Sequence, residues 1–282
     1  MNLAIFTTLS ELGHYLQSHR SQSIGFVPTM GALHLGHQSL IDRARHENTL
    51  VIVSIFVNPL QFGPNEDLDR YPRPVEIDRA ICETAGVDVL FLPTPESIGI
   101  RATLTQVIPP PMMMSGLCGQ TRAGHFQGVA TIVTKLLNIV QPDRAYFGEK
   151  DAQQLAIIRT IVADLNLPVE IVGCPTLRAD SGLAHSSRNQ YLSPTGTAQA
   201  AVIYRSLKKA QALGSSGEIH APAILAAVMT ELLTVPEFQL EYLELVNPET
   251  LQSIEVVTGS ALIAVAGRIE STRLIDNITI GK

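Results

Sequence analysis

The sequence predicts an α/β protein: a parallel sheet covered by helices, followed by a smaller α+β part. Two observations lead to this class. Over the first two-thirds of the chain, short β-branched runs alternate with segments of helical periodicity, which is the pattern of a parallel sheet with helical connections. Past about Thr176 the order changes to a polar loop, two helices and two strand-like runs.

Five runs in the first part are too short for helices and are mostly apolar on both faces, as buried parallel strands are. We expect strands at Ser23–Val27, Leu50–Val57, Val87–Leu92, Arg144–Phe147 and Val169–Gly173. Between them, apolar residues recur at steps of three and four in Phe126–Val140 and in Ala152–Leu165, so both are predicted core helices. Residues 1–176 are therefore expected to form a Rossmann-like domain.

The remaining chain, residues 177–282, is expected to form a second, smaller domain. Helices are predicted at Pro194–Leu213 and Ala221–Leu233, joined by the flexible stretch GSSGE. Strand-like runs follow at Gln239–Val246 and Ala261–Ala266. The prediction for this part is a small α+β domain that contacts substrates and acts as a lid.

The composition is that of a folded protein with a large core. Among 282 residues, 45% are hydrophobic and 16% are charged, which excludes a disordered chain. The formal net charge of −6 argues against a nucleic-acid partner. Three cysteines suit a reducing compartment, the N-terminal stretch lacks a basic leader, and no run approaches the roughly 20 apolar residues of a membrane helix. We expect a cytoplasmic protein without a membrane partner.

Two histidines stand where the first predicted strand leads into a helix. The segment from Gly25 to His37 holds a glycine-containing turn, with His34 and His37 three residues apart at the helix start. In a doubly wound sheet this turn lies at the carboxyl end of a strand, where free backbone N–H groups and the helix dipole favour a phosphate. Either histidine alone is more often structural, but the pair favours a shared ligand. A zinc site is disfavoured, because no third ligand has suitable spacing.

Polar residues also gather after the second predicted strand and before the helix at Phe126. Asn58 and Gln61 are either turn formers or the neutral donors and acceptors of a small polar substrate. Arg122 and His125 lie at the threshold of the helix rather than on its buried stripe. For His125, a capping or core role stays open beside contact with a ligand.

The turn after the predicted strand Arg144–Phe147 carries Lys150, which can act as a point charge on phosphate oxygens. Asp151 is either the N-cap of the following helix or a partner of a phosphate-bound cation such as Mg²⁺. Gln154 lies one helical turn further on and can face the same crevice. The loop Arg178–Asn189, with two arginines and paired serines, is either a linker or a lid over phosphates.

Several stretches of the chain, taken in order, closely resemble the pantothenate synthetase (pantoate:beta-alanine ligase) family. They are VPTMGALHLGH, SIFVNPLQF, DLDRYPRP, RAGHFQGVATIVTKLLNIVQPDRAYFGEKDAQQL, SSRNQYLS and RLIDNI. The resemblance covers nearly the whole chain and implies a nucleotidylyltransferase, with the HxGH signature that class I aminoacyl-tRNA synthetases share. It also implies that ATP, pantoate and beta-alanine are converted into pantothenate, AMP and pyrophosphate, by a homodimer that needs Mg²⁺.

The same resemblance implies roles for particular residues. His37 matches the catalytic proton donor, His34 stands beside it at the phosphates, and Lys150 and Arg188 offset negative charge. Residues matched to the ATP site are Met30, Gly31, Ala32, Leu33, His34, Leu35, Gly36, His37, Gly148, Glu149, Lys150, Asp151, Leu177, His185, Ser186, Ser187 and Arg188. Residues matched to the pantoate and beta-alanine sites are Gln61, Gln154, Asn58, Tyr71 and, at the edge, Arg122. No protein ligand of the metal is assigned.

The chain departs from the family pattern at Leu35, where Glu is frequent, at Ala123, where Pro is frequent, and at His185, where Met is usual. Some relatives continue into a fused nucleoside monophosphate kinase. A GxxxxGK motif ending at Lys282 would need glycine where Asp276 stands, so we expect no kinase activity. Two other functions stay open: a related enzyme that adenylates a different acid, and a nucleotide-binding sensor without turnover.

Overall fold

The computed structural model describes residues 3–64 and 66–281, and its chain divides into two compact units. The first unit runs through Pro109 and adds Arg122–Glu149 and Ile157–Pro175. The second holds Pro110–Thr121, Lys150–Ala156 and the chain from Thr176 onward. Two stretches that the sequence analysis placed in the first domain, Pro110–Thr121 and Lys150–Ala156, thus group with the second unit. The functional roles given to the two domains stay predictions.

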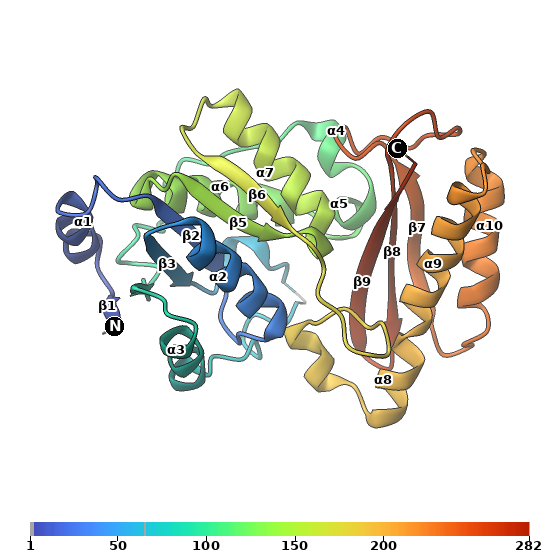
Figure 1. Ribbon diagram of the computed structural model, residues 1–282, viewed down its shortest axis with the longest axis horizontal. Coiled ribbons are helices and arrows are strands. Elements are labelled where there is room, and N and C mark those ends of the chain that lie inside the picture. Colours follow the sequence, from blue (N-terminus) through green and yellow to red (C-terminus); the bar gives the residue numbers. More distant parts are fainter. Residues whose placement is uncertain (1–2, 65, 282) are drawn as a thin grey trace. The chain divides into compact units, whose positions relative to one another are not determined.

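The first unit is built on a six-stranded parallel sheet (Figure 1). Its order is β1-β4-β3-β2-β5-β6, and this confirms the predicted Rossmann-like α/β class. The strands are β1 (Ala4–Phe6), β2 (Ile24–Thr29), β3 (Leu50–Ile55), β4 (Val89–Phe91), β5 (Arg144–Gly148) and β6 (Glu170–Cys174). Each of the five predicted strands is present within a few residues of its expected bounds, and β1 is an addition.

Helices connect these strands, as the sequence periodicity predicted. They are α1 (Leu9–Gln17), α2 (Leu35–Glu47), α3 (Val75–Thr84), α6 (His125–Val140) and α7 (Ala152–Asp164), with short 3-10 turns η1 (Pro59–Gln61) and η2 (Glu149–Asp151). Leu40, Ile41 and Ala44 of α2 pack in one core cluster with Val27 of β2 and Val53 of β3. This burial fixes α2 against β2 and β3.

The second unit is an antiparallel sheet with helices packed on it (Figure 1). The sheet has the order β7-β8-β9, with β7 at Gln239–Val246, β8 at Ala261–Ile269 and β9 at Thr272–Ile280. Its helices are α4 (Pro111–Met114), α5 (Leu117–Thr121), α8 (Pro194–Ala200), α9 (Val202–Ser215) and α10 (Ala221–Leu232), with the 3-10 turn η3 at Ser187–Tyr191. Leu207 of α9, Val228 of α10 and Ile263 of β8 share one core.

Two features of this unit differ from the sequence prediction. The single helix expected at Pro194–Leu213 is broken into α8 and α9, because the N–H of Ala201 bonds to the carbonyl of Gln199 instead of continuing the helical ladder. The strand β9 was not predicted, although it pairs with β8 along its whole length.

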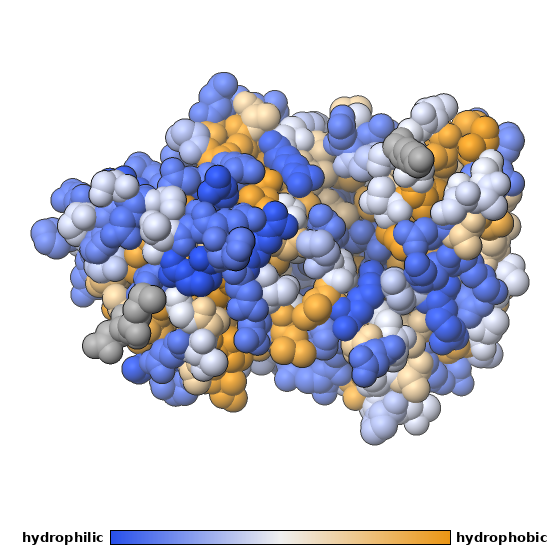
Figure 2. Space-filling view, viewed as in Figure 1, coloured by the Kyte–Doolittle hydropathy of each residue, from blue (hydrophilic) through white to orange (hydrophobic). Residues whose placement is uncertain are grey.

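No helix formed by residues 3–64 and 66–281 is long and apolar enough to cross a membrane. On the face shown in Figure 2, hydrophobic residues lie in small groups between hydrophilic ones.

Candidate functional site

The topology of the first unit brings several predicted site residues to one edge of the sheet. From β2 the chain moves to β3 on one side, whereas β5 lies on the other side of β2, so the strand order reverses between β2 and β5. Ligands of open α/β sheets bind at the carboxyl ends of the strands around such a switch point. Met30–His37 follow β2, Asn58 and Gln61 follow β3, and Gly148 and Glu149 stand at the end of β5.

His34 and His37 cap the first turn of α2 reciprocally. His34 is the N-cap residue, and its Nδ1 accepts the N–H of Gly36 at 3.1 Å. The Nδ1 of His37 accepts the N–H of His34 at 3.3 Å, and the two ring centroids are 4.0 Å apart. Because a backbone N–H can only donate, each Nδ1 carries a lone pair. In the neutral rings the proton therefore lies on Nε2, which makes both Nε2 atoms hydrogen-bond donors.

Several backbone N–H groups of this segment already have partners, which differs from the expectation of free N–H groups at the helix start. The N–H groups of Ala32 and Leu33 donate to the Asp78 carboxylate at 2.8 and 2.7 Å, and that of Gly31 donates to Thr29 Oγ1 at 3.1 Å. The histidines occupy two more. An anion at this turn would thus be offered imidazole Nε2–H groups in place of these backbone donors.

The same contacts bear on the zinc alternative. Both Nδ1 atoms already accept backbone N–H groups, so neither Nδ1 is available to bind a metal. Over residues 3–64 and 66–281, no group of three His, Cys, Asp or Glu side chains is placed to hold a metal ion. The arrangement fits a zinc site poorly, since such sites use three or four protein ligands.

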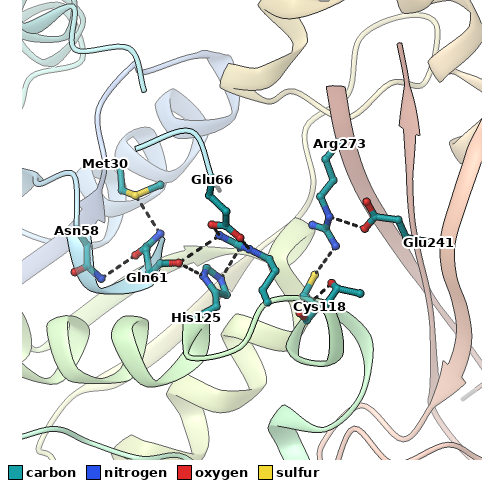
Figure 3. A network of polar contacts seen from close by, with 10 residues as sticks. Met30, Asn58, Gln61, Glu66, Cys118, His125, Glu241 and Arg273 are labelled. Atoms are coloured by element: carbon teal, nitrogen blue, oxygen red, sulfur yellow. Dashed lines mark hydrogen bonds and ion pairs between the residues drawn. The ribbon is translucent and has the colours of Figure 1, made fainter. Parts of the chain in front are cut away.

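Gln61 is oriented by its neighbours (Figure 3). Asn58 donates from Nδ2 to Gln61 Oε1 at 2.9 Å, and Gln61 Nε2 lies 3.1 Å from Met30 Sδ. Asn58 is 2% exposed and also caps η1, where its Oδ1 accepts the N–H of Leu60 at 3.1 Å. Asn58 is thus a turn former that also orients Gln61, while the Gln61 amide is only partly buried. Tyr71, also buried, stacks edge-on against Phe62.

Glu66, labelled in Figure 3, forms an ion pair with Arg122. Arg122 Nε and Nη2 donate to the two Glu66 oxygens at 2.7 and 2.6 Å. Burial raises the pKa of Glu66, but the hydrogen bonds and charge of Arg122 outweigh it and leave that pKa below its ordinary value. Protonation of Glu66 below that pKa would break the pair.

His125 joins this ion pair to the Gln61 segment. His125 Nδ1 lies 2.9 Å from the Gln61 carbonyl oxygen, which can only accept, so Nδ1 donates. The Nε2 of the neutral ring then accepts from Arg122 Nη1 at 2.9 Å. His125 is the first residue of α6 and is buried, so its contacts favour the structural role among the alternatives left open for it.

In the second unit, Lys150 is held from β9. Asn277 Nδ2 donates to the Lys150 carbonyl at 2.8 Å. Asp151 directly precedes α7, so it can act as a cap or face a cation, and both interpretations stay open. Gln153 is buried and bridges Cys118 N–H to the carbonyls of Met113 and Gly116, whereas the predicted substrate residue Gln154 is partly exposed.

The predicted lid loop is anchored at its base. Arg178 donates to both carboxylate oxygens of Asp276 at 2.5 and 3.0 Å and lies over the Tyr204 ring at 3.9 Å from its centroid. His185 N–H donates to the Leu177 carbonyl at 3.0 Å. Ser186 caps η3, in which Ser187 and Arg188 are the first residues. In the same unit, Arg273 pairs with Glu241 at 2.7 Å (Figure 3).

Sequence reasoning missed three residues that organise these segments: Asp78, Asp276 and Asn277. Asp276 and Asn277 belong to RLIDNI, which was noted as a family stretch without a role. Their place in this family stretch is the signal that could have identified Asp276 and Asn277. Asp78 follows DLDRYPRP and had no signal of its own in the sequence.

The fold and this sheet edge define a Rossmann-like α/β protein with two histidines at its topological switch point. A family model described as pantoate-beta-alanine ligase matches residues 4–279. The chain belongs to this family, as the sequence resemblance predicted.

Solved structures and curated relatives agree with this assignment. The pantothenate synthetase of Thermus thermophilus is 47% identical, with a TM-score of 0.91 over 98% of both chains. The pantoate-beta-alanine ligase of Francisella tularensis, in complex with beta-gamma ATP and beta-alanine, is 36% identical, with a TM-score of 0.80 over 98% of this chain and 97% of that one. The bifunctional pantoate ligase/cytidylate kinase of Trichormus variabilis is 54% identical over 98% of this chain and 56% of the relative. The chain thus spans about half the length of the curated relatives it matches.

Proposed function

We propose that this chain joins pantoate and beta-alanine to form pantothenate, at the expense of ATP, through a pantoyl-adenylate. AMP and pyrophosphate are the other products. The observation that carries the proposal is the pair of reciprocally capping histidines at the sheet's switch point. It is supported by family membership and by the relative whose structure holds beta-gamma ATP and beta-alanine. We further propose that the protein acts as a cytoplasmic homodimer without nucleic-acid or membrane partners.

The proposed chemistry has two steps. The pantoate carboxylate attacks the α-phosphorus of ATP, and pyrophosphate leaves. The beta-alanine amine then attacks the carbonyl carbon of the mixed anhydride, and AMP leaves. The first step brings an anion onto a polyanion, so the protein has to offset charge rather than supply a strong base.

The residues of this chain suit that task. The Nε2–H groups of His34 and His37 would donate to phosphate oxygens, and Lys150 and Arg188 would add positive charge. Gln61 and Gln154 would hold the attacking carboxylate by neutral amides, which stabilise its charge less than an arginine would and so preserve its nucleophilicity. The remaining segments Met30–His37, Gly148–Asp151, Leu177 and His185–Arg188 would line the nucleotide.

A magnesium ion fits this donor set only when it is bound together with phosphate. Mg²⁺ commonly uses one or two carboxylates, several waters and substrate phosphates. Asp151 and Glu149, both exposed in η2, are the carboxylates that would hold it. When bound, it would neutralise charge on the triphosphate.

Pantoate-dependent exchange of labelled pyrophosphate into ATP tests the function. We expect exchange that requires pantoate and does not require beta-alanine, because the adenylate forms before the amine reacts. An enzyme for a different acid would show exchange only with that acid, and a nucleotide sensor would show none. Either of those results would overturn the proposal.

Gly128 provides a mutational test of the Gln61 segment. A Cβ at Gly128 of α6 would lie 2.2 Å from the Leu60 carbonyl oxygen and 2.7 Å from the Gln61 nitrogen, both main-chain atoms. Gly128→Ala must therefore displace η1 and, with it, the Gln61 amide. We expect the KM for pantoate to rise on the order of tenfold, as a lost substrate hydrogen bond would produce.

A matched control is Gly13→Ala in α1, where a Cβ would have no neighbour within 4 Å. We expect this variant to keep the wild-type KM for pantoate and to be slightly stabilised, since alanine favours the helix more than glycine does. A Gly128→Ala enzyme with the wild-type KM would show that η1 does not position a pantoate contact.

A further inference from the structure

Asp78 is a buried carboxylate that contacts the backbone of the segment leading to the two histidines. It lies on α3 and is 1% exposed. Its Oδ2 accepts the N–H of Ala32 at 2.8 Å, and its Oδ1 accepts the N–H of Leu33 at 2.7 Å. Within residues 3–64 and 66–281, no arginine, lysine or histidine forms an ion pair with this carboxylate. Both carboxylate oxygens therefore accept hydrogen bonds from the same turn of the chain.

That turn needs support, because its backbone is unusual. Gly31 has φ of 81° and Ala32 has φ of 50°, so two successive residues adopt the left-handed region, which alanine rarely does. The turn is also tightly enclosed: a Cβ at Gly31 would lie 2.8 Å from Ile55 Cγ2 and 2.9 Å from Asp78 Oδ2. The Asp78 carboxylate fits this space and satisfies two N–H groups that the turn directs toward it.

The charge on Asp78 does not serve stability. Burial raises its pKa above the ordinary value, although the N–H groups of Leu33 and Ala32 act in the opposite direction. A carboxyl group with a raised pKa in the folded protein ionises more readily in the unfolded chain. Its contribution to stability is therefore lost as the pH rises through the folded pKa. Groups whose pKa is shifted by burial are concentrated at functional sites.

We propose that Asp78 is a positioning residue, whose carboxylate holds the Gly31–Leu33 turn in the conformation that presents His34 and His37 to the nucleotide. It acts through the backbone and does not touch a substrate. By accepting the N–H groups of Ala32 and Leu33, the carboxylate also places a negative charge beside them and leaves the imidazoles as the donors for phosphate. The nucleotide part of this inference rests on the proposed function; the part about the turn does not.

Asp78→Asn tests the proposal. The amide has one acceptor oxygen, and its NH₂ group would face the second N–H of the turn. We expect amide hydrogen exchange at Ala32 and Leu33 to speed up at least tenfold, and the Kd for ATP measured by calorimetry to rise at least tenfold. The buried N–H left without an acceptor lowers the unfolding midpoint, so both values are measured where Asp78→Asn remains folded. A merely structural residue would lower the midpoint and leave the Kd for ATP of the folded protein unchanged. Glu83→Gln, on the exposed face of the same helix, is the matched control and should change none of these values.

A second measurement on the unaltered protein keeps the proposal testable if Asp78→Asn does not fold. In an NMR titration, the amide shifts of Ala32 and Leu33 should move together with the Asp78 carboxyl carbon, at a pH above the ordinary aspartate range. Cys82, one turn along α3, does not interfere, because burial raises the pKa of its thiol to about 12. His34 is the next titratable residue of the turn, and its ring carbons report its own titration separately.

The outcomes separate this inference from the proposed function. If the wild type shows no pantoate-dependent exchange but the amides follow Asp78, the proposed function fails and the positioning of the turn stands. If Ala32 and Leu33 do not follow the Asp78 carboxyl group, or if a folded Asp78→Asn protein keeps its amide protection and its Kd for ATP, the inference is overturned, whatever the activity.

Discussion

Replacing His37 by asparagine is expected to lower kcat by about 10²–10³-fold, the usual result of removing one donor to the charge that develops in a transition state. The asparagine Oδ1 occupies the place of Nδ1 and can still accept the N–H of His34, which His37 accepts at 3.3 Å. The side chain lacks a donor at the position of Nε2. The variant should therefore fold with an intact cap and fail in the first chemical step, which steady-state kinetics and urea unfolding measure together.

His37→Gln is the matched variant with the opposite defect. Its amide nitrogen reaches the position of Nε2 and can donate, but no acceptor remains for the N–H of His34. We expect it to lose about 1 kcal/mol of stability, as other lost helix caps do, and to keep more activity than His37→Asn. If asparagine supports the faster turnover of the two, Nδ1 rather than Nε2 is the important atom, and the assignment of the proton to Nε2 has no catalytic meaning.

The fold was largely predictable because its strands are buried on both faces. Runs such as Leu50–Ile55 are apolar except for Ser54 and are mostly buried, so strand length and class could be derived from hydropathy alone. Strand β9 was not predicted, because Asp276 stands between Leu274 and Ile278 and interrupts the alternation of apolar residues on the inner face. Strand β1 has only three residues, too few for a pattern. The missing elements are thus those where a buried charge or a short length removes the periodic signal.

The candidate site was predictable in its residue types but not in its hydrogen bonding. A pair of histidines after a glycine turn indicates an anion site, yet nothing in the spacing shows that both Nδ1 atoms accept backbone N–H groups. Asp78 shows the limit most clearly. On α3, Ile77 is 63% exposed while Asp78 is 1% exposed, the reverse of what hydropathy predicts. Only the turn at Ala32 and Leu33, remote in sequence, explains this inversion.

Asp276→Ala should destabilise the protein by about 3 kcal/mol, the lower end of what removal of one partner from a buried ion pair typically costs. Asp276 is 4% exposed and meets the Arg178 guanidinium with both oxygens. Without the carboxylate, Arg178 keeps its contacts with the Tyr204 ring and, at 3.2 Å, with the Gly182 carbonyl, which limits the loss. Urea unfolding at neutral pH gives the change in free energy directly.

A double variant identifies the cause of this destabilisation. Arg178→Met combined with Asp276→Leu removes both charges, so it should recover part of the stability that Asp276→Ala loses. Glu83→Ala, which breaks an exposed pair with Arg79, should leave the unfolding free energy within error. A loss at Asp276 no larger than at Glu83 would show that the buried pair does not anchor the Arg178 loop.

The same substitution should also affect catalysis. Because Asn277, the next residue of β9, donates to the Lys150 carbonyl, we expect Asp276→Ala to lower turnover as well as stability. The double variant should regain stability without regaining full activity, since the loop that precedes His185–Arg188 would still lack its anchor.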